Sequence, residues 1–105
     1  MGMESKYVWM DGELVDFEKA TVHMLTPALH YGAAVFEGIR AYNTYKGPAV
    51  FRLTEHADRL LDSARVFGIR ELPFTVEEVV KGVKDTVRAN GFTDCYIRPL
   101  LYIKG

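Results

Sequence analysis

Cysteine is nearly absent from this sequence: it occurs once in 105 residues, at position 95. A single thiol cannot form an internal disulfide, so the chain is not a disulfide-stapled secreted domain, and we expect a soluble, cytoplasmic protein. Long apolar runs are missing too. None approaches the ~20 residues that a membrane-spanning helix requires, so we expect no membrane partner. The 13 lysines and arginines nearly balance the 14 aspartates and glutamates, which argues against nucleic acid as a partner.

The motifs of several enzyme classes are also missing. The three histidines (His23, His30 and His56) lie far apart and no cysteine pair accompanies them, so we predict no metal centre. The glycines are too widely spaced for a phosphate-binding loop, and there is no G-x-S-x-G nucleophile elbow. We interpret His23 and the lone Cys95 as structural residues, the commoner role of such side chains.

What the sequence does contain is an unusual segment at residues 29–42, whose second half alternates like a β-strand. Side chains on a strand point alternately to its two faces. One face would carry Phe36, Gly38, Arg40 and Tyr42, and the other Glu37, Ile39 and Ala41. The first face is atypical of a core, and a glycine weakens a strand unless something approaches its backbone closely. The alternative is an edge strand with a bulge at Gly38.

Further strands are predicted around this segment. Asp11-Gly12 between two apolar runs indicates a β-hairpin, because both positions tolerate a positive φ. Residues 16–28 show no regular pattern. A short strand is predicted over 49–53, antiparallel to the previous one because the connection is short. A last strand over 94–103 should be interrupted at Pro99, which has no N–H to donate to a sheet.

Two helices are predicted between the strands, over residues 54–67 and 76–90. Apolar residues recur at helical spacing in both. Thr54 is the expected N-cap of the first helix. For the second, Thr75 and Glu78 form a capping box, in which each side chain accepts a hydrogen bond from the backbone N–H of the other residue.

Three arginines stand out as candidate ligand-binding residues: Arg40, Arg59 and Arg98. A planar guanidinium can hold a carboxylate or a phosphate with two parallel hydrogen bonds. Aromatic residues accompany them at Tyr31, Phe36 and Tyr96, and the combination predicts a small anionic ligand. For Arg59 the alternative is an ordinary surface ion pair with Glu55 or Asp62, worth little. Because interface centres are also rich in aromatic residues and arginine, a non-enzymatic interaction module stays open.

Several blocks of the sequence resemble, in order, those of branched-chain amino-acid aminotransferases, which belong to class IV of the pyridoxal-phosphate-dependent aminotransferases. The main block joins Leu29-His30-Tyr31-Gly32 to Val35-Phe36-Glu37-Gly38-Ile39-Arg40, and the others span 8–13, 51–60 and 96–100. The resemblance covers nearly the whole chain. It implies an α+β fold, a two-layer domain with two helices packed on an antiparallel sheet. Residues 1–105 would be the N-terminal small domain, with a larger domain beyond Gly105.

The resemblance also implies roles for single residues. Arg59 matches the arginine that holds the phosphate of pyridoxal phosphate, and Arg98 matches the group that meets the distal carboxylate of glutamate. The substrate pocket would be lined by Tyr31, Phe36, Gly38 and Tyr96, with Arg40 near its mouth. In this family part of the pocket comes from the neighbouring subunit, so a homodimer is expected.

The catalytic lysine of the family, which forms the Schiff base with pyridoxal phosphate, lies beyond the small domain, and no lysine of this chain matches it. The resemblance implies that the full-length protein transfers amino groups between branched-chain L-amino acids (leucine, isoleucine, valine) and 2-oxoglutarate. This fragment alone is expected to be inactive. Related class IV enzymes are the alternatives: a D-amino-acid aminotransferase, an R-selective amine transaminase or an aminodeoxychorismate lyase.

Overall fold

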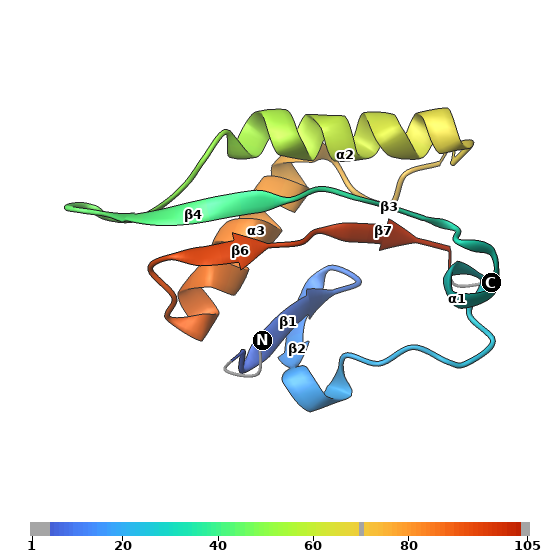
Figure 1. Ribbon diagram of the computed structural model, residues 1–105, viewed down its shortest axis with the longest axis horizontal. Helices are drawn as coiled ribbons and strands as arrows, with labels where there is room; N and C mark the ends of the chain where they lie inside the picture. The colour runs from blue at the N-terminus through green and yellow to red at the C-terminus, as the bar shows by residue number, and fades with distance from the viewer. Residues whose placement is uncertain (1–4, 70, 104–105) are drawn as a thin grey trace.

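A computed structural model describes residues 5–69 and 71–103 (Figure 1). In chain order the elements are β1 (Tyr7–Met10), β2 (Glu13–Asp16), the 3-10 helix η2 (Phe17–Lys19), α1 (Pro27–Tyr31), β3 (Ala34–Phe36), β4 (Ile39–Thr44), β5 (Gly47–Val50), α2 (Leu53–Phe67), α3 (Val76–Asn90), β6 (Cys95–Ile97) and β7 (Leu100–Tyr102). The strand pairs are antiparallel, which confirms the expected α+β class. None of the helices that the structure describes has the length and apolar character of a membrane span.

The Asp11-Gly12 hairpin is confirmed. Strands β1 and β2 pair with Met10 opposite Glu13, so the turn contains two residues, and both have positive φ values, 55° and 92°. The side chain of Asn90, at the end of α3, fastens this hairpin to the helix. Its Oδ1 accepts the N–H groups of Lys6 at 2.6 Å and Tyr7 at 3.0 Å, and its Nδ2 donates to the Tyr7 carbonyl at 3.0 Å.

The segment between the hairpin and the sheet is more regular than its sequence indicates. We expected no regular structure over 16–28, but η2 lies there and the short helix α1 begins at Pro27. Helix α1 starts at Pro27, whose fixed φ and missing N–H suit the first helical position. It ends at Gly32 in the left-handed conformation, with a φ of 65°.

The alternating strand is interrupted at residues 37 and 38. β3 pairs with β7, whereas β4 pairs with β5 and β6, so the expected single sheet is divided into two sheets beside the separate hairpin. On the opposite side Pro99 separates β6 from β7, as predicted. Pro99 has no N–H to continue the pairing, but its carbonyl accepts the Glu37 N–H at 3.1 Å. The predicted alternation persists through the break: Glu37, Ile39 and Ala41 are buried, and Phe36, Arg40 and Tyr42 are exposed.

Helix α2 begins one residue before its expected N-cap. The strand expected over 49–53 ends at Val50, and the cap position is Arg52, with a φ of 49° and no side-chain capping bond. The prediction of Thr54 as N-cap is therefore wrong. The sharp turn at Arg52 allows Leu53 to be buried in the core, which explains why the helix begins where the local capping signal does not place it.

Helix α3 begins as its sequence predicts. The Glu78 N–H donates to the Thr75 Oγ1 at 3.2 Å, and the Thr75 N–H donates to the Glu78 carboxylate at 2.9 Å, which completes the capping box.

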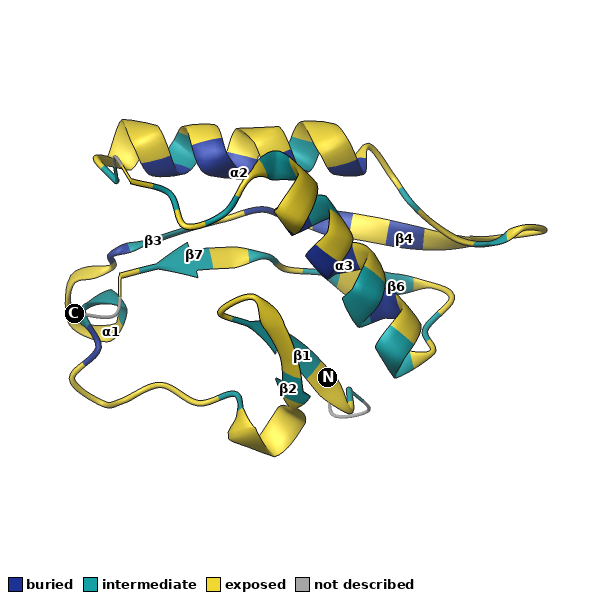
Figure 2. Ribbon diagram, turned by 180° about the vertical axis from the view of Figure 1, so that it is seen from behind, coloured by how far each residue is buried: buried dark blue, intermediate teal, exposed yellow. Residues whose placement is uncertain are grey.

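Both long helices cover the same face of the strands (Figures 1 and 2). Two groups of apolar side chains fill the space between them. The first joins Ala57, Leu60 and Leu61 of α2 to Val79 of α3, and the second joins Ile39 and Leu53 to Val83. The opposite face of the strands carries Phe36, Arg40, Tyr96 and Arg98, all exposed. The candidate ligand-binding residues of the strands therefore stand on the face that the helices leave open, whereas Arg59 lies on α2 and Tyr31 at the end of α1.

Candidate functional site

A buried carboxylate holds Arg59 in place. The Glu37 residue is only 6% exposed, and Arg59 donates to its carboxylate twice, from Nε to Oε2 at 3.0 Å and from Nη2 to Oε1 at 2.7 Å. The Nδ1 atom of His56 lies 2.8 Å from Oε1. Because an ionised carboxylate only accepts hydrogen bonds, Nδ1 is the protonated ring nitrogen in this contact. Three N–H groups thus converge on one buried carboxylate.

Local structure explains why these three residues meet. Strand alternation turns Glu37 toward the helix-covered side, and the break between β3 and β4 places it beneath α2. His56 and Arg59 are three positions apart in α2, so their side chains project from the same side of the helix. A charge that faces the core requires partners, and these two supply them.

The electrostatics keep the carboxylate ionised. The hydrogen bond from Arg59 is the main cause that lowers the pKa of Glu37 below its ordinary value, with His56 adding to the effect and burial opposing it. In return, Glu37 raises the pKa of the Arg59 guanidinium. Both groups therefore carry their charges near neutral pH. The Arg59 side chain is nevertheless 66% exposed, so it remains accessible to a ligand.

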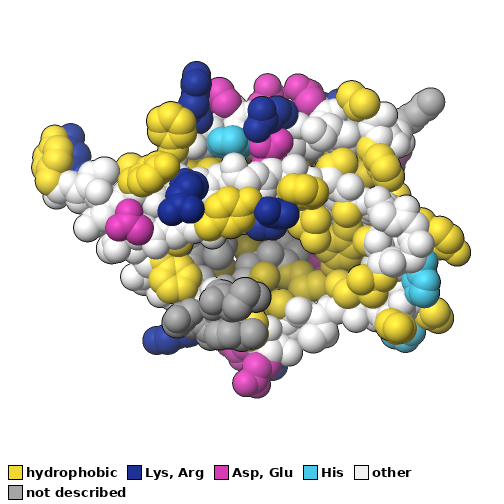
Figure 3. Space-filling view, in the orientation of Figure 1, with side chains coloured by type: hydrophobic (Ala, Val, Ile, Leu, Met, Phe, Trp, Pro, Cys, Tyr) yellow, Lys and Arg dark blue, Asp and Glu magenta, His cyan; other side chains and the backbone are white. Residues whose placement is uncertain are grey.

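On the open face of the strands, Arg98 forms a cluster with two aromatic residues. Its Nη2 donates to the Tyr96 hydroxyl at 2.7 Å, and its guanidinium carbon lies 4.4 Å from the centre of the Phe36 ring and 5.4 Å from that of Tyr96. Phe36 and Tyr96 are each about half exposed. Figure 3 shows basic and apolar side chains side by side on this face. The cluster combines apolar surface with one fixed positive charge.

Gly38 makes room for this cluster. A Cβ atom there would collide with the Tyr96 hydroxyl and would lie 3.2 Å from Cζ of the same ring. The group that closely approaches the backbone at Gly38 is thus the phenol of Tyr96, a side chain of the same chain.

The other predicted site residues are less tightly joined to this cluster. Arg40 is paired across the strands with Tyr96, and its guanidinium carbon lies 6.0 Å from the centre of the Tyr42 ring. Tyr31, at the end of α1, is 83% exposed, and its ring centre lies 6.1 Å from that of His30. The structure thus brings Phe36, Gly38, Tyr96 and Arg98 together, with Arg40 beside them.

Sequence reasoning missed Glu37 and His56 as members of the site. The alternative in which Arg59 pairs with Glu55 or Asp62 is wrong, because those carboxylates pair with Arg52 at 3.3 Å and Arg65 at 2.7 Å. A signal was present in the alternation, which places the charge of Glu37 on the same face as Ile39 and Ala41. The pattern did not identify the residues that pair with Glu37.

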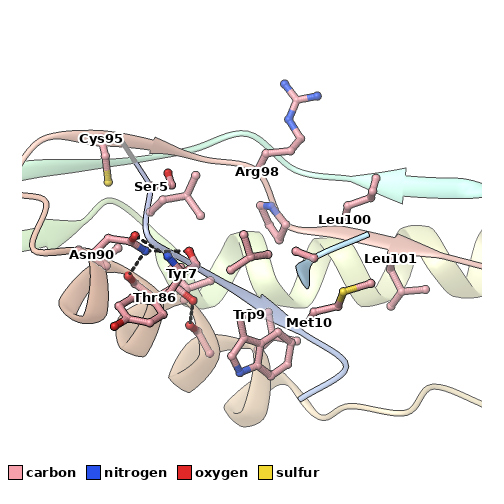
Figure 4. A pocket seen from close by; sticks show the side chains of 18 of the residues that line it. Ser5, Tyr7, Trp9, Met10, Thr86, Asn90, Cys95, Arg98, Leu100 and Leu101 are labelled. Atoms are coloured by element: carbon pink, nitrogen blue, oxygen red, sulfur yellow. Dashed lines mark hydrogen bonds between the residues drawn. The ribbon is translucent and has the colours of Figure 1, made fainter. Parts of the chain in front are cut away.

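A groove lies on the side of β6 and β7 opposite the Arg98 cluster. It has a volume of about 490 Å³ and is lined mainly by apolar side chains of the β1 strand, α3 and these two strands. Figure 4 shows Trp9 and Met10 in the groove, whereas Arg98 points away from it. Cys95 also lines the groove, and burial raises the pKa of its thiol. A protonated thiol agrees with its structural interpretation.

Comparison with known proteins agrees with these observations. The family described as amino-transferase class IV matches residues 34–105, which include the break at Glu37 and Gly38, both long helices and the Arg98 cluster. The chain belongs to the class IV aminotransferase family. The branched-chain-amino-acid aminotransferase of Escherichia coli K12 is 44% identical over 100 residues, covering 95% of this chain and 32% of that protein.

Solved class IV aminotransferases share the fold. The branched-chain aminotransferase of the archaeon Thermoproteus uzoniensis, crystallised with norvaline, is 54% identical with a TM-score of 0.89, covering 96% of this chain and 34% of that one. The T.th. branched-chain amino acid aminotransferase is 51% identical with a TM-score of 0.89, covering 93% of this chain and 33% of that one. It was solved with N-(5'-phosphopyridoxyl)-L-glutamate and with 4-methylvaleric acid. The chain spans about a third of the length of these relatives.

Proposed function

We propose that the full-length protein is a pyridoxal-phosphate-dependent aminotransferase that moves amino groups between branched-chain L-amino acids and 2-oxoglutarate. Residues 1–105 supply its N-terminal small domain. The observation that carries the proposal is the Arg98 cluster, in which one guanidinium lies against Phe36 and Tyr96 at the bare backbone of Gly38. Such a wall suits a substrate pair of which one member ends in a hydrocarbon group and the other in a carboxylate.

The two substrate types would use different parts of this wall. The rings of Phe36 and Tyr96 offer apolar surface to a leucine, isoleucine or valine side chain. Arg98 offers a charge-assisted contact to the distal carboxylate of glutamate or 2-oxoglutarate. The ligands of the T.th. relative, an apolar carboxylic acid and a glutamate derivative, support this division. Arg40, cross-strand from Tyr96, lies where it would border the same pocket.

Arg59 fits the phosphate of pyridoxal phosphate. Its guanidinium is charged, exposed and held by Glu37 through only two of its five N–H groups, so donors remain for a phosphate oxygen. When bound, pyridoxal phosphate supplies an electron-accepting ring that stabilises the negative charge left when a proton leaves the substrate. The lysine that carries the cofactor would lie in a larger domain outside this chain.

We further propose that the protein acts as a cytoplasmic homodimer in which Tyr31 reaches the pocket of the neighbouring subunit. Support comes from its position. The ring stands 83% exposed at the end of α1, away from the Arg98 cluster, and Met24, Leu25 and Leu29 nearby are exposed apolar residues. A surface of this kind is typical of a contact between proteins.

The substrate proposal can be tested by comparing Arg98→Leu with the native full-length protein. The kcat/KM for L-glutamate should fall much more than that for L-leucine, because only glutamate has a second carboxylate. Arg88→Leu serves as the control, since Arg88 is an exposed arginine that pairs with Asp85 on α3. Equal losses for both substrates would contradict the role given to Arg98. Activity on D-alanine or a chiral amine instead of L-leucine would favour another class IV enzyme.

The fragment proposal has a separate test. Borohydride should trap pyridoxal phosphate on one lysine of the full-length protein, located by peptide mapping after residue 105, and should label no lysine of residues 1–105 specifically. Stoichiometric labelling of one lysine within residues 1–105 would overturn the proposal that the cofactor lysine lies in a further domain.

A further inference from the structure

We propose that Glu37 is a positioning residue for Arg59: by holding one edge of the guanidinium, it presets the other edge for the phosphate group of the cofactor. The inference rests on the proposed function, in which Arg59 contacts that phosphate. It assigns to a buried residue a part in cofactor binding that needs no contact with the cofactor itself.

The geometry of the pair supports this assignment. Glu37 accepts from Nε and from Nη2 of Arg59, at 3.0 and 2.7 Å, so it occupies the edge of the guanidinium formed by these two nitrogens. A guanidinium carries five N–H groups in one plane. The neighbouring edge, formed by Nη1 and the second N–H of Nη2, has the spacing for two parallel bonds to a phosphate. One edge is anchored to the protein and the other is available to a ligand.

Glu37 is itself firmly held, which a positioning residue requires. Its N–H is bonded to the carbonyl of Pro99 at 3.1 Å, and its carboxylate also contacts Nδ1 of His56 at 2.8 Å. The side chain is only 6% exposed. An arginine tied to such an anchor has already lost most of its rotamer freedom before a ligand arrives, so less entropy is lost on binding.

The other ion pairs along α2 lack this anchor. Arg52 pairs with Glu55 and Arg65 pairs with Asp62, and all four side chains are between 54% and 63% exposed. Of these three carboxylates only that of Glu37 is buried, and it comes from the break between β3 and β4. A carboxylate next to a phosphate site also has an unfavourable side, because its negative charge repels the phosphate. Glu37 therefore has two opposite effects on phosphate binding: it favours binding by orienting Arg59 and opposes it by its own negative charge.

The test uses the full-length protein freed of cofactor, in which pyridoxal phosphate and pyridoxal are compared by fluorescence titration. Pyridoxal has no phosphate, so its affinity measures every contact of the cofactor except those made with the phosphate. Glu37→Gln should weaken pyridoxal phosphate binding on the order of tenfold or more, as loss of a residue that orients a ligand typically does, with unchanged affinity for pyridoxal. The same variant should lose the thermal stabilisation that inorganic phosphate gives to the native apoprotein.

Two further variants separate the possible causes. Glu37→Asp keeps the charge but withdraws the carboxylate from Arg59, so it should show a smaller loss confined to pyridoxal phosphate. Glu55→Gln is the matched control, because it removes a carboxylate from α2 that pairs with Arg52 and should change neither affinity. Unchanged or tighter pyridoxal phosphate binding in Glu37→Gln would overturn the positioning role, and so would an equal loss for both ligands.

Arg59→Ala distinguishes failure of this inference from failure of the proposed cofactor contact. If Arg59→Ala weakens pyridoxal phosphate alone but both Glu37 variants do not, the arginine binds the phosphate without needing its anchor, and only the inference is wrong. If Arg59→Ala leaves pyridoxal phosphate binding unchanged, the phosphate contact proposed for Arg59 is wrong as well.

Discussion

Replacing Gly38 by alanine should damage the proposed substrate pocket and leave the fold nearly intact. The new Cβ would collide with the Tyr96 hydroxyl and lie 3.2 Å from its Cζ and 3.4 Å from its Cε1. The ring therefore has to move. Because Tyr96 is 52% exposed, it can rotate into solvent rather than into the core, so the strain on the domain is small.

The size of the effect follows from the bond that this rotation breaks. Arg98 donates to the Tyr96 hydroxyl at 2.7 Å, and a hydrogen bond to a charged group contributes about 1.5–3 kcal/mol when it is shielded from water. In the free protein, water replaces the lost partner, so the free energy of unfolding should fall by less than about 1 kcal/mol. With substrate bound, a displaced Arg98 should lower kcat/KM for glutamate by about tenfold, equivalent to about 1.4 kcal/mol.

The assay measures two quantities on the full-length protein: kcat/KM for L-glutamate and for L-leucine, and the free energy of unfolding in urea. Gly82→Ala is the matched control, because its Cβ would lie 2.7 Å from Cε2 of Trp9 within the packed interface of α3 and the hairpin. Overpacking costs about 1–3 kcal/mol, offset by about 1 kcal/mol of helix propensity, so this variant should lose stability and keep its kcat/KM. A Gly38→Ala protein with lowered stability and native kcat/KM would refute the reasoning.

Three other predictions concern stability. Thr75→Ala removes one side of the capping box and should lower the free energy of unfolding by about 1 kcal/mol, whereas Thr75→Ser should restore it in the same urea titration. Asn90→Ala releases the hairpin from α3 and should cost about 1–3 kcal/mol, with faster hydrogen exchange at the Tyr7 amide; unchanged exchange would contradict this role. The third concerns pH: because the folded pKa of Glu37 is lowered from 4.5, its contribution is present above that value and is lost as pH falls through the folded pKa. Acidification below pH 4.5 should therefore destabilise the native protein more than it destabilises the Glu37→Gln variant, as measured by thermal unfolding at a series of pH values. The same pH dependence of stability in both proteins would argue against this.

The elements that sequence reasoning placed correctly are those whose signals are local. The Asp11-Gly12 turn, the capping box at Thr75 and the interruption at Pro99 each depend on residues within a few positions of one another. Alternation likewise placed Tyr96 and Arg98 on one face. The errors lie where long-range packing overrides a local preference: α2 begins at Leu53 rather than after Thr54, because the apolar side chain of Leu53 enters the core.

The sequence by itself determined which side chains share a face, and so which aromatic residues and arginines could act together. Only the tertiary structure decided the partner of Arg59. Its local candidates, Glu55 and Asp62, are taken by Arg52 and Arg65, and Glu37 reaches it from 22 positions away. The reason is burial: a carboxylate that the strand alternation turns inward cannot remain unpaired in the core, and whichever cation the fold brings above it becomes its partner.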